Sequence, residues 1–255
     1  DDYLSSGLGI QFNNCITSYN LAQQELNIYN AFYELGKSEV DYKDADIDRY
    51  INEYENIVGF KLEKEQRDAV FLLKHRGGII AGSAGSGKTT VSNCMVYVLN
   101  KLDPYVDIKF AAPTGKAAKR MQEVVKKEVK TLNSLFKVYE TSKNILEDDE
   151  DDSIDGEVYF FDEGAMIRLD LLNSVTKKMD INNSRIYLFG DYHQLPPIGK
   201  GLPFKDLLRF MPCVFLTVSK RAADGSDITR NSDYINNFSE YNNWKNLVSG
   251  KDFIL

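Results

Sequence analysis

Residues 82–90 constrain the fold of this 255-residue chain more than any other segment. They read GSAGSGKTT and satisfy the pattern G-x-x-x-x-G-K-[ST]. In this pattern the glycines let backbone N–H groups turn toward phosphate oxygens, at the start of a helix whose dipole favours anions. The apolar run at 78–81 predicts a short buried strand before the segment, and residues 91–99 predict a helix after it. The segment therefore predicts a strand–loop–helix unit that binds the phosphates of a nucleoside triphosphate.

The residues of this loop receive distinct predicted roles. Lys88 is expected to reach the β- and γ-phosphates, and the Thr89 hydroxyl is expected to ligate Mg²⁺. The alternative is a glycine-rich turn that happens to precede Lys-Thr, and the flanking strand and helix argue against it. The predicted nucleotide contacts in the loop are Gly82, Ser83, Ala84, Gly85, Ser86, Gly87, Lys88, Thr89 and Thr90.

The net charge of −7 is distributed unevenly along the chain. Residues 147–157 contain eight acidic residues and no basic one, so the remainder of the chain has a net charge of +1. Six basic residues gather within residues 116–130: Lys116, Lys119, Arg120, Lys126, Lys127 and Lys130. The overall acidity therefore does not exclude a nucleic-acid partner, because the charge near a binding surface matters more than the total. The basic segment can equally be a solvated helix face.

Composition limits the cellular setting. Cys15, Cys94 and Cys213 lie far apart without a C-x-x-C pair, which indicates buried thiols in a reducing compartment. No apolar run is long enough to span a bilayer, and the N-terminus lacks a basic-then-apolar signal segment. We therefore expect a cytoplasmic monomer without a membrane partner. The chain starts at Asp1 and not at Met, which we interpret as a fragment of a longer protein.

Two regions differ in their hydrophobic pattern. Residues 1–60 predict two helices, at 19–35 with Gly36 as C-cap and at 45–57 before Gly59, either as a packing appendage or as a site for a protein partner. Residues 61–255 alternate strands with helices, which predicts an α/β domain with a mostly parallel sheet covered on both faces. Its further strands are expected at 106–112, 158–161, 185–189 and 213–217, and its further helices at 64–75, 114–130, 169–179 and 204–210.

Polar residues follow two of these strands. Asp162 and Glu163 end the apolar run at 158–161, and Gln194 follows the strand at 185–189. Ligands of open α/β sheets bind beyond the carboxyl ends of the strands, where the phosphate loop also lies. Asp162 is therefore expected to hold Mg²⁺ through water, and Glu163 to orient and deprotonate an attacking water. Gln194 can contact the γ-phosphate through its amide, or it can belong to a proline-rich turn.

Several segments, in this order, resemble the motifs of superfamily 1 helicases, and in detail those of RecD-like helicases. Gln66 matches the glutamine that recognises adenine in the family, and Asn133 stands where a histidine is usual in a threonine-histidine element. Residues 111–118 (AAPTGKAA) resemble the motif that follows the second strand and touches single-stranded DNA. The similarity also includes GDYHQLP at 190–196 and LTVSKR at 216–221 with GSDI at 225–228, and it covers about residues 60–240.

The resemblance implies a RecA-like P-loop fold that hydrolyses ATP with Mg²⁺ and moves 5′ to 3′ on single-stranded DNA. The implied catalytic residues are Lys88, Glu163, Gln194 and Arg221, with Arg221 and Gln194 at the γ-phosphate. Pro113, Thr114 and Lys116 are the candidate DNA contacts on the first turn of the basic helix. DNA binding needs cations for phosphates and flat groups for bases, so Tyr192 and His193 are candidates at the neighbouring strand end.

The chain also departs from the family pattern. Gly164 and Ala165 stand where the family usually has alanine or serine and then serine, so a hydroxyl that could link ATP to the DNA path is missing. Helicases of this family need a second RecA-like domain, and we find none in residues 1–255. We therefore expect these residues to bind ATP, to turn it over slowly and not to unwind DNA.

Two other functions use the same loop. A nucleotide-dependent interaction module would dock a partner protein through the N-terminal helices and the acidic run, without translocation. A small-molecule kinase would need a lid or an acceptor-binding segment, and neither is evident in the sequence. ATPase activity stimulated by single-stranded DNA distinguishes the helicase from the interaction module.

Overall fold

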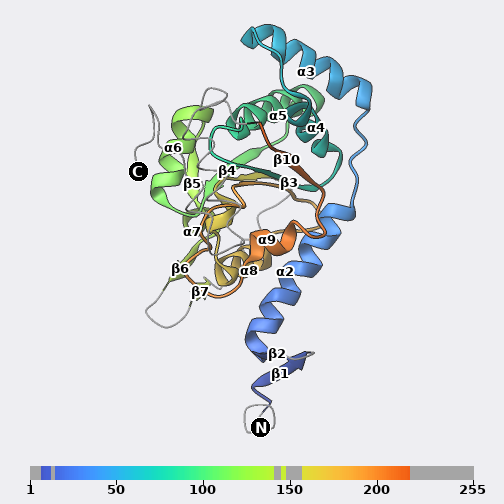
Figure 1. The fold of residues 1–255 in the computed structure, drawn as a ribbon. Coiled ribbons are helices and arrows are strands. Elements are labelled where there is room, and N and C mark those ends of the chain that lie inside the picture. Colours follow the sequence, from blue (N-terminus) through green and yellow to red (C-terminus); the bar gives the residue numbers. More distant parts are fainter. Residues whose placement is uncertain (1–6, 13–14, 141–144, 148–156, 219–255) are drawn as a thin grey trace, which may run out of the picture.

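The computed structural model describes residues 7–12, 15–140, 145–147 and 157–218. Its centre is a six-stranded sheet in the order β10-β3-β9-β8-β4-β5 (Figure 1). Every neighbouring pair of strands in this sheet is parallel. The prediction of an α/β domain with a mostly parallel sheet is confirmed. The strands are β3 Gly77–Gly82, β4 Ile108–Ala112, β5 Val129–Thr131, β8 Val158–Phe161, β9 Arg185–Gly190 and β10 Cys213–Leu216.

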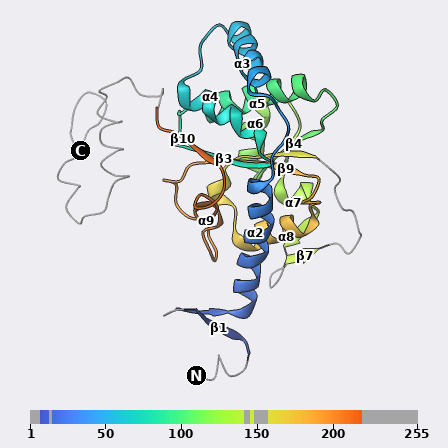
Figure 2. The ribbon, with the colours of Figure 1, turned by 90° about the vertical axis from the view of Figure 1, so that its right-hand side faces the viewer.

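Helices cover both faces of the sheet, as Figures 1 and 2 show. One face is covered by α2 Tyr19–Lys37, α7 Leu132–Leu135, α8 Leu169–Lys178 and α9 Pro203–Leu207. The other face is covered by α3 Asp44–Val58, α4 Lys64–Val70, α5 Lys88–Leu102 and α6 Gly115–Val125. Each face has its own hydrophobic core, so the sheet is buried on both sides.

The alternation of side chains along β8 explains this double burial. Tyr159 and Phe161 point into the core that α2 and α8 cover, and Val158 and Phe160 point into the core below α5 and α6. All four side chains are buried, which accounts for the continuous apolar run in the sequence. Fully burying a side chain of this size contributes roughly 1.5–3 kcal/mol of transfer free energy. The strand is therefore fixed in register, and the acids that follow it are fixed with it.

The N-terminal region packs against both cores. A hairpin of β1 Gly9–Phe12 and β2 Cys15–Ser18, which the sequence did not predict, precedes α2. α2 belongs to one core and α3 to the other. Gly59 ends α3 in the left-handed conformation, as predicted, with φ 78°. The division of the chain at residue 60 stays a prediction.

Gly36 has a different role from the predicted one. It lies inside α2, which continues to Lys37, so it is not a C-cap. A Cβ at this position would lie 2.8 Å from Cδ of Pro212, just before β10. The glycine therefore allows the helix to approach the sheet closely.

Some other predicted boundaries also need correction. The basic helix does not reach Lys130, because Lys126 takes the left-handed conformation and residues 129–131 form the edge strand β5. The predicted helix at 64–75 is α4 followed by a 3₁₀ turn, Phe71–Lys74, and the one at 204–210 ends at Leu207. β6 Val138–Glu140 pairs with β7 Ile145–Glu147, and most of the acidic run, residues 148–156, lies outside the described residues. None of the described helices has the length and apolar character needed to cross a membrane.

Candidate active site

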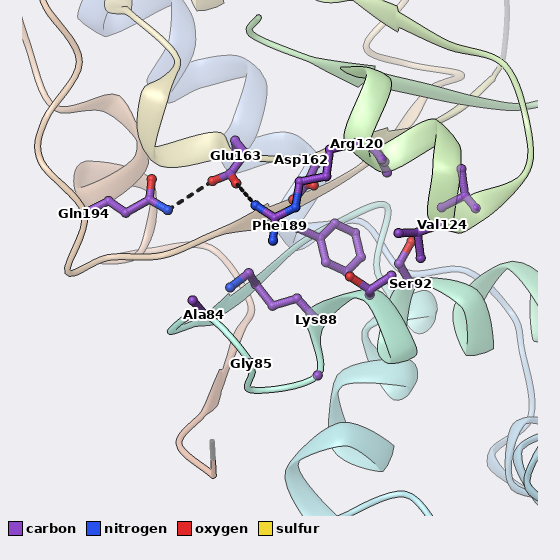
Figure 3. A pocket seen from close by; sticks show the side chains of 14 residues that line it. Ala84, Gly85, Lys88, Ser92, Arg120, Val124, Asp162, Glu163, Phe189 and Gln194 are labelled. Atoms are coloured by element: carbon purple, nitrogen blue, oxygen red, sulfur yellow. Dashed lines mark hydrogen bonds and ion pairs between the residues drawn. The ribbon is translucent and has the colours of Figure 1, made fainter. Parts of the chain in front are cut away.

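A cavity of about 220 Å³ lies where the carboxyl ends of β3, β8 and β9 meet α6 (Figure 3). The phosphate loop forms one wall of this cavity, and the acids after β8 form another. Its lining residues are Ala84, Gly85, Gly87, Lys88, Thr89, Ser92, Arg120, Met121, Val124, Val125, Asp162, Glu163, Phe189 and Gln194. Parallel strands bring these residues together from distant parts of the sequence, as the prediction required.

Short contacts fix the shape of the loop. Gly85 and Gly87 adopt positive φ angles of 88° and 91°, which residues with a Cβ rarely adopt. Ser86 is buried, and its hydroxyl donates a hydrogen bond of 2.9 Å to the carbonyl of Ser83. A Cβ on Gly82 would lie 2.4 Å from the Ser86 hydroxyl oxygen. The loop therefore closes tightly between the end of β3 and the first turn of α5.

Lys88 points along this loop. Its ammonium group donates hydrogen bonds to the carbonyls of Gly82, at 2.5 Å, and Ser83, at 2.9 Å. The same side chain lines the cavity together with Thr89. Of the nine predicted loop contacts, Ala84, Gly85, Gly87, Lys88 and Thr89 reach the cavity, whereas Gly82, Ser83, Ser86 and Thr90 are not among its lining residues.

Gln66 lies beneath the loop. Its side chain is buried, donates to the carbonyl of Ser86 at 3.3 Å and accepts from the backbone N–H of Glu63 at 3.0 Å. Its amide nitrogen also lies in the space that a Cβ on Gly87 would need. Gln66 is not among the residues that line the cavity. In this structure it supports the loop, and its predicted contact with adenine stays a prediction.

The neighbouring residue Glu65 reaches the end of β10, the strand beside β3. Its carboxylate accepts hydrogen bonds of 2.6 Å from both the backbone N–H and the hydroxyl of Thr217, just after β10. These hydrogen bonds lower the pKa of Glu65 below its ordinary value. The first turn of α4 thus contacts the phosphate loop through Gln66 and the exit of β10 through Glu65.

Asp162 and Glu163 differ in their surroundings. Burial raises the pKa of Asp162, and the charge of Glu163 raises it further, while Lys88 and Arg120 act in the opposite direction. Glu163 adopts the left-handed conformation with φ 51°, which is uncommon for a residue with a side chain of this size. The backbone then turns into the 3₁₀ segment Gly164–Met166. The chain therefore turns sharply at Glu163, and both acids line the cavity.

Glu163 has two partners across the cavity, shown as dashed lines in Figure 3. The side-chain amide of Gln194 donates to one carboxylate oxygen at 3.1 Å. The guanidinium of Arg120 lies 3.9 Å from the other oxygen. The structure therefore brings Gln194 to the acids, as predicted, and adds Arg120, which the sequence indicated only as part of a basic helix face.

A tight turn presents Gln194. Asp191 is buried and accepts from the backbone N–H of His193 at 3.0 Å through its side chain, and from that of Gln194 at 3.2 Å through its carbonyl. A Cβ on Gly190 would lie 2.6 Å from the ring of Phe204. Residues 190–194 are therefore a packed turn, and Gln194 projects from it toward Glu163.

The apolar end of the cavity was not predicted. Met121, Val124 and Val125 of α6 face Phe189 of β9 and Ser92 of α5 there. The spacing of the α6 residues would have allowed a prediction that this helix buries one face. It would not have shown that part of this face borders the phosphate loop.

The candidate DNA contacts lie outside the cavity. Pro113, Thr114 and Lys116 follow β4, and the Thr114 hydroxyl caps α6 by accepting from the N–H of Ala117 at 3.2 Å. The rings of Tyr192 and His193 lie 4.1 Å apart between centroids. Arg221 lies outside the described residues. Every other predicted residue thus lies in or beside the carboxyl edge of the sheet.

Comparisons with known proteins agree with this arrangement. Residues 66–200 match a family described as AAA domain. The ATP-dependent RecD2 DNA helicase of Deinococcus radiodurans is 32% identical over 166 residues, which cover 64% of this chain and 22% of that protein. The RecBCD enzyme subunit RecD of Haemophilus influenzae is 28% identical over 160 residues, or 54% of this chain and 25% of that subunit.

Two further proteins extend the comparison. The uncharacterized protein MJ1519 of Methanocaldococcus jannaschii is 30% identical over 181 residues, which cover 66% of this chain and 15% of that protein. A solved structure of Pif1 helicases at forked DNA is similar in fold, with a TM-score of 0.52, 23% identity, and coverage of 75% of this chain and 52% of that chain. The chain thus spans a quarter or less of the length of these three curated relatives. It belongs to the AAA domain family as a RecD-like superfamily 1 helicase motor domain with the RecA-like fold.

Proposed function

We propose that the cavity binds ATP with Mg²⁺ and that hydrolysis there drives movement along single-stranded DNA. The observation that supports this most directly is the placement of Glu163. Its carboxylate lies between Gln194 and Arg120 and faces the same cavity as Lys88. A carboxylate opposite a phosphate loop is suited to accept a proton from a water that attacks the γ-phosphate.

The loop would hold the phosphates. The backbone N–H groups of residues 84–89 lie just before and at the start of α5, whose positive dipole end favours anions. Lys88 would exchange its bonds to the carbonyls of Gly82 and Ser83 for bonds to phosphate oxygens. Gln66 would recognise adenine, either by direct contact or by holding the loop through its hydrogen bond to Ser86. The Gln66→Ala variant tests this role, because it should change the preference for ATP over GTP.

Thr89 and Asp162 fit a Mg²⁺ ion that also takes phosphate oxygens. Among the described residues there is no cluster of three or more His, Cys, Asp or Glu side chains that could hold a metal ion alone. A hydroxyl and one carboxylate beside a phosphate site suit Mg²⁺, which keeps several water ligands and binds through substrate phosphates. When bound, the ion would neutralise phosphate charge and favour the ionised form of Asp162, whose pKa is raised without it.

The remaining residues would position the reacting groups. Gln194 would hold Glu163 in its present orientation and donate to the γ-phosphate when that group is bound. Arg120 would help to orient the Glu163 carboxylate through its ion pair with the other carboxylate oxygen. Arg221 would add a cation at the γ-phosphate, as the resemblance to RecD-like helicases implies.

DNA would bind along the carboxyl edge of the sheet. Pro113, Thr114 and Lys116 would contact the phosphate backbone, and Tyr192 and His193 would contact bases or phosphates. The support comes from the sequence motifs and from relatives whose names describe DNA helicases. Because the chain spans 22% of the RecD2 protein, strand separation and its 5′-to-3′ direction would depend on further domains of a full-length protein.

Substitution of Lys88 tests the nucleotide site. Lys88→Ala should weaken the binding of a fluorescent ATP analogue with Mg²⁺ by about tenfold or more, because charge-assisted hydrogen bonds contribute roughly 1.5–3 kcal/mol. Lys101→Ala, on the last turn of the same helix, should leave the affinity unchanged. Equal affinities for the two variants would contradict the assignment of the site.

The DNA dependence of turnover tests the motor function. Full-length protein should hydrolyse ATP faster in the presence of single-stranded oligonucleotides, and Lys116→Glu should reduce this stimulation. An interaction module without translocation would bind nucleotide as tightly and show no stimulation by DNA.

A cytoplasmic monomer is the expected form, and light scattering of the purified protein measures its oligomeric state.

A further inference from the structure

A second and larger depression lies between α2 and α8, away from the nucleotide cavity. Its volume is about 1000 Å³, against about 220 Å³ for the cavity at Lys88. One wall comes from residues 18–27, the second from residues 168–177 and the third from residues 198–200, which follow β9. We call this depression the α2–α8 groove. Its size and its open form suit an extended ligand rather than a small molecule.

Hydrogen bonds and close contacts define the walls. Asn27 of α2 donates to Asn173 of α8 at 3.2 Å, which joins the two helices along the floor. Gly201 adopts a positive φ of 76°, and a Cβ there would lie 3.1 Å from Cβ of Leu169. The loop after β9 is therefore packed directly on the first turn of α8. Figures 1 and 2 show α2 alongside α8.

The charge of the groove is opposite to that of the chain. Its lining contains three cations, Arg168, Lys177 and Lys200, and one carboxylate, Asp170, so its formal charge is +2. The chain as a whole has a net charge of −7. Arg168 holds Asp170 in a two-point contact at 2.9 and 2.7 Å. The single carboxylate is thus neutralised locally, and the groove favours an anion.

Amide side chains add hydrogen-bond donors along the groove. α2 contributes four of them and α8 one: Asn20, Gln23, Gln24, Asn27 and Asn173. Within this row Gln24 donates to Asn20 at 2.7 Å and Gln23 to Asn27 at 3.1 Å. An amide carries two N–H donors and each of these bonds uses one, so the row offers further donors to a ligand. Rows of amides and cations commonly contact phosphate and sugar oxygens.

Both helices begin in this groove. Ser18 caps α2 and Arg168 precedes α8, and both residues line it, so each helix presents its positive dipole end to the groove. The first turn of α2 contains no acidic residue that would offset its dipole. Tyr19, with 54% of its surface exposed, follows Ser18 in the lining and offers an aromatic ring for stacking.

The groove also continues from the candidate DNA contacts. Residues 198–200 form one of its walls and belong to the loop that begins with Tyr192 and His193. An acidic peptide would match the charge of the groove, but it would not use the exposed ring of Tyr19. A nucleic-acid strand matches the cations, the amides and the ring together. The observations therefore favour a phosphodiester strand over an acidic protein segment.

We propose that the α2–α8 groove binds a stretch of single-stranded nucleic acid, with Lys177 and Lys200 at phosphates and Tyr19 against a base. The proposal rests on the proposed DNA-driven function and adds a second contact region, separate from the one at Pro113, Thr114 and Lys116. Its binding would depend little on base sequence, because phosphate contacts and stacking carry little sequence information.

Charge reversal in the groove tests the proposal on full-length protein. We expect Lys177→Glu with Lys200→Glu to weaken binding of a fluorescein-labelled oligo-dT 20-mer, followed by anisotropy, by about tenfold or more at low salt. The salt dependence should also become shallower, by about 0.7 in logarithmic slope for each phosphate of the single strand that no longer has a lysine beside it. Lys43→Glu with Lys101→Glu makes the same change of charge at the N-cap of α3 and on α5, and should leave the affinity near that of the wild type.

Tyr19 supplies an independent measurement. Tyr19→Ala should weaken oligo-dT binding about fivefold or more because the stacking ring is removed, while Tyr19→Phe keeps the ring and should bind as the wild type does. Mg²⁺–ATP affinity and thermal unfolding should be unchanged in all of these variants, which shows that they are folded. An affinity for oligo-dT equal to that of the α3/α5 control would overturn the groove proposal.

The outcomes also separate this proposal from the proposed function. If Lys116→Glu weakens oligo-dT binding and the groove variants do not, only the groove proposal is wrong. If the wild type binds no oligo-dT while it binds ATP through Lys88, the proposed DNA-driven function is wrong as well. If a labelled poly-glutamate peptide binds in a way that depends on Lys177 and Lys200, and oligo-dT does not, the groove serves an acidic protein partner and the proposal fails.

Discussion

The nucleotide cavity and the α2–α8 groove are built differently. The cavity is small, and side chains from three strand ends and α6 converge on it, with a buried carboxyl group at Asp162 and a strained backbone at Glu163. The groove is several times larger, and two helices line it with amides that bond to one another. Reaction at one phosphorus atom requires fixed geometry, whereas contact with a repeating backbone requires only charge and donors. The two regions should therefore respond very differently to single substitutions.

The largest expected effect is at Glu163. Glu163→Gln keeps the size of the side chain and removes the base, so kcat for ATP hydrolysis should fall by about 10²–10⁴-fold. Nucleotide affinity and oligo-dT affinity should stay close to those of the wild type, because neither binding step needs the proton acceptor. Single-turnover hydrolysis and anisotropy measure the three quantities. Turnover within tenfold of the wild type would remove Glu163 from its proposed role.

Two glycines test how tightly each region is held. Gly87→Ala places a Cβ 2.2 Å from Nε2 of Gln66 at a positive φ of 91°, and Gly201→Ala places one 3.1 Å from Leu169 at a φ of 76°. The left-handed conformation alone costs roughly 1–2 kcal/mol for each residue. Gly201→Ala should therefore lower the free energy of unfolding in urea by about 1–2 kcal/mol and weaken only DNA binding. Gly87→Ala should lower the free energy of unfolding by more than this and should also weaken nucleotide binding. The reverse order would show that the groove is the more rigid region.

Arg120 should have an intermediate effect confined to the cavity. Its guanidinium is 64% exposed, and exposed ion pairs contribute at most about 1 kcal/mol, so Arg120→Ala should lower kcat by about fivefold or less. Lys119→Ala, also exposed and one residue away, should leave kcat unchanged. Equal effects of the two substitutions would show that Arg120 acts only as a surface charge and not through its contact with Glu163.

Asp162 should show the smallest effect, and its direction depends on pH. Because the pKa of Asp162 is raised by folding, the native state binds this proton more tightly than the unfolded chain does. Its contribution to stability therefore falls as pH rises from the pKa of the unfolded chain, about 3.9, through that of the folded protein. Without Mg²⁺, Asp162→Asn should unfold at a slightly higher temperature than the wild type near neutral pH, and the difference should vanish at low pH. Addition of Mg²⁺ and ATP should raise the unfolding temperature of the wild type by more than that of Asp162→Asn.

Sequence patterns predicted the elements whose burial is complete. β3 and β8 are apolar throughout, and β9 is apolar after Arg185. The residues after these strands carry the motifs, so both strands and site residues were foreseeable. β5 was not, because Val129–Thr131 is a three-residue edge strand inside a basic segment that also suits a helix. Gly36 was misread as a cap, since only the packed Pro212 shows why a glycine is needed inside α2. The predicted role of Arg221 stays untested.

The candidate site was foreseeable for a different reason than the groove. Lys88, Asp162, Glu163 and Gln194 follow strands, and the rule that ligands bind at carboxyl ends brings them together without any side-chain detail. Arg120 needed the structure, because its contact with Glu163 depends on how α6 crosses the end of β8. The groove could also be recognised only from the structure, because no pattern in residues 18–27 indicates that they lie beside residues 168–177.

The contacts of α4 have a consequence for local opening of the protein. Gln66 bonds to Ser86 in the phosphate loop, and its neighbour Glu65 bonds to Thr217 after β10. One helical turn therefore joins two segments that are distant in sequence. Segments that share their hydrogen bonds in this way open together as one cooperative unit. We expect amide hydrogen exchange in the loop and at the end of β10 to proceed at similar rates, and to slow together when nucleotide occupies the loop.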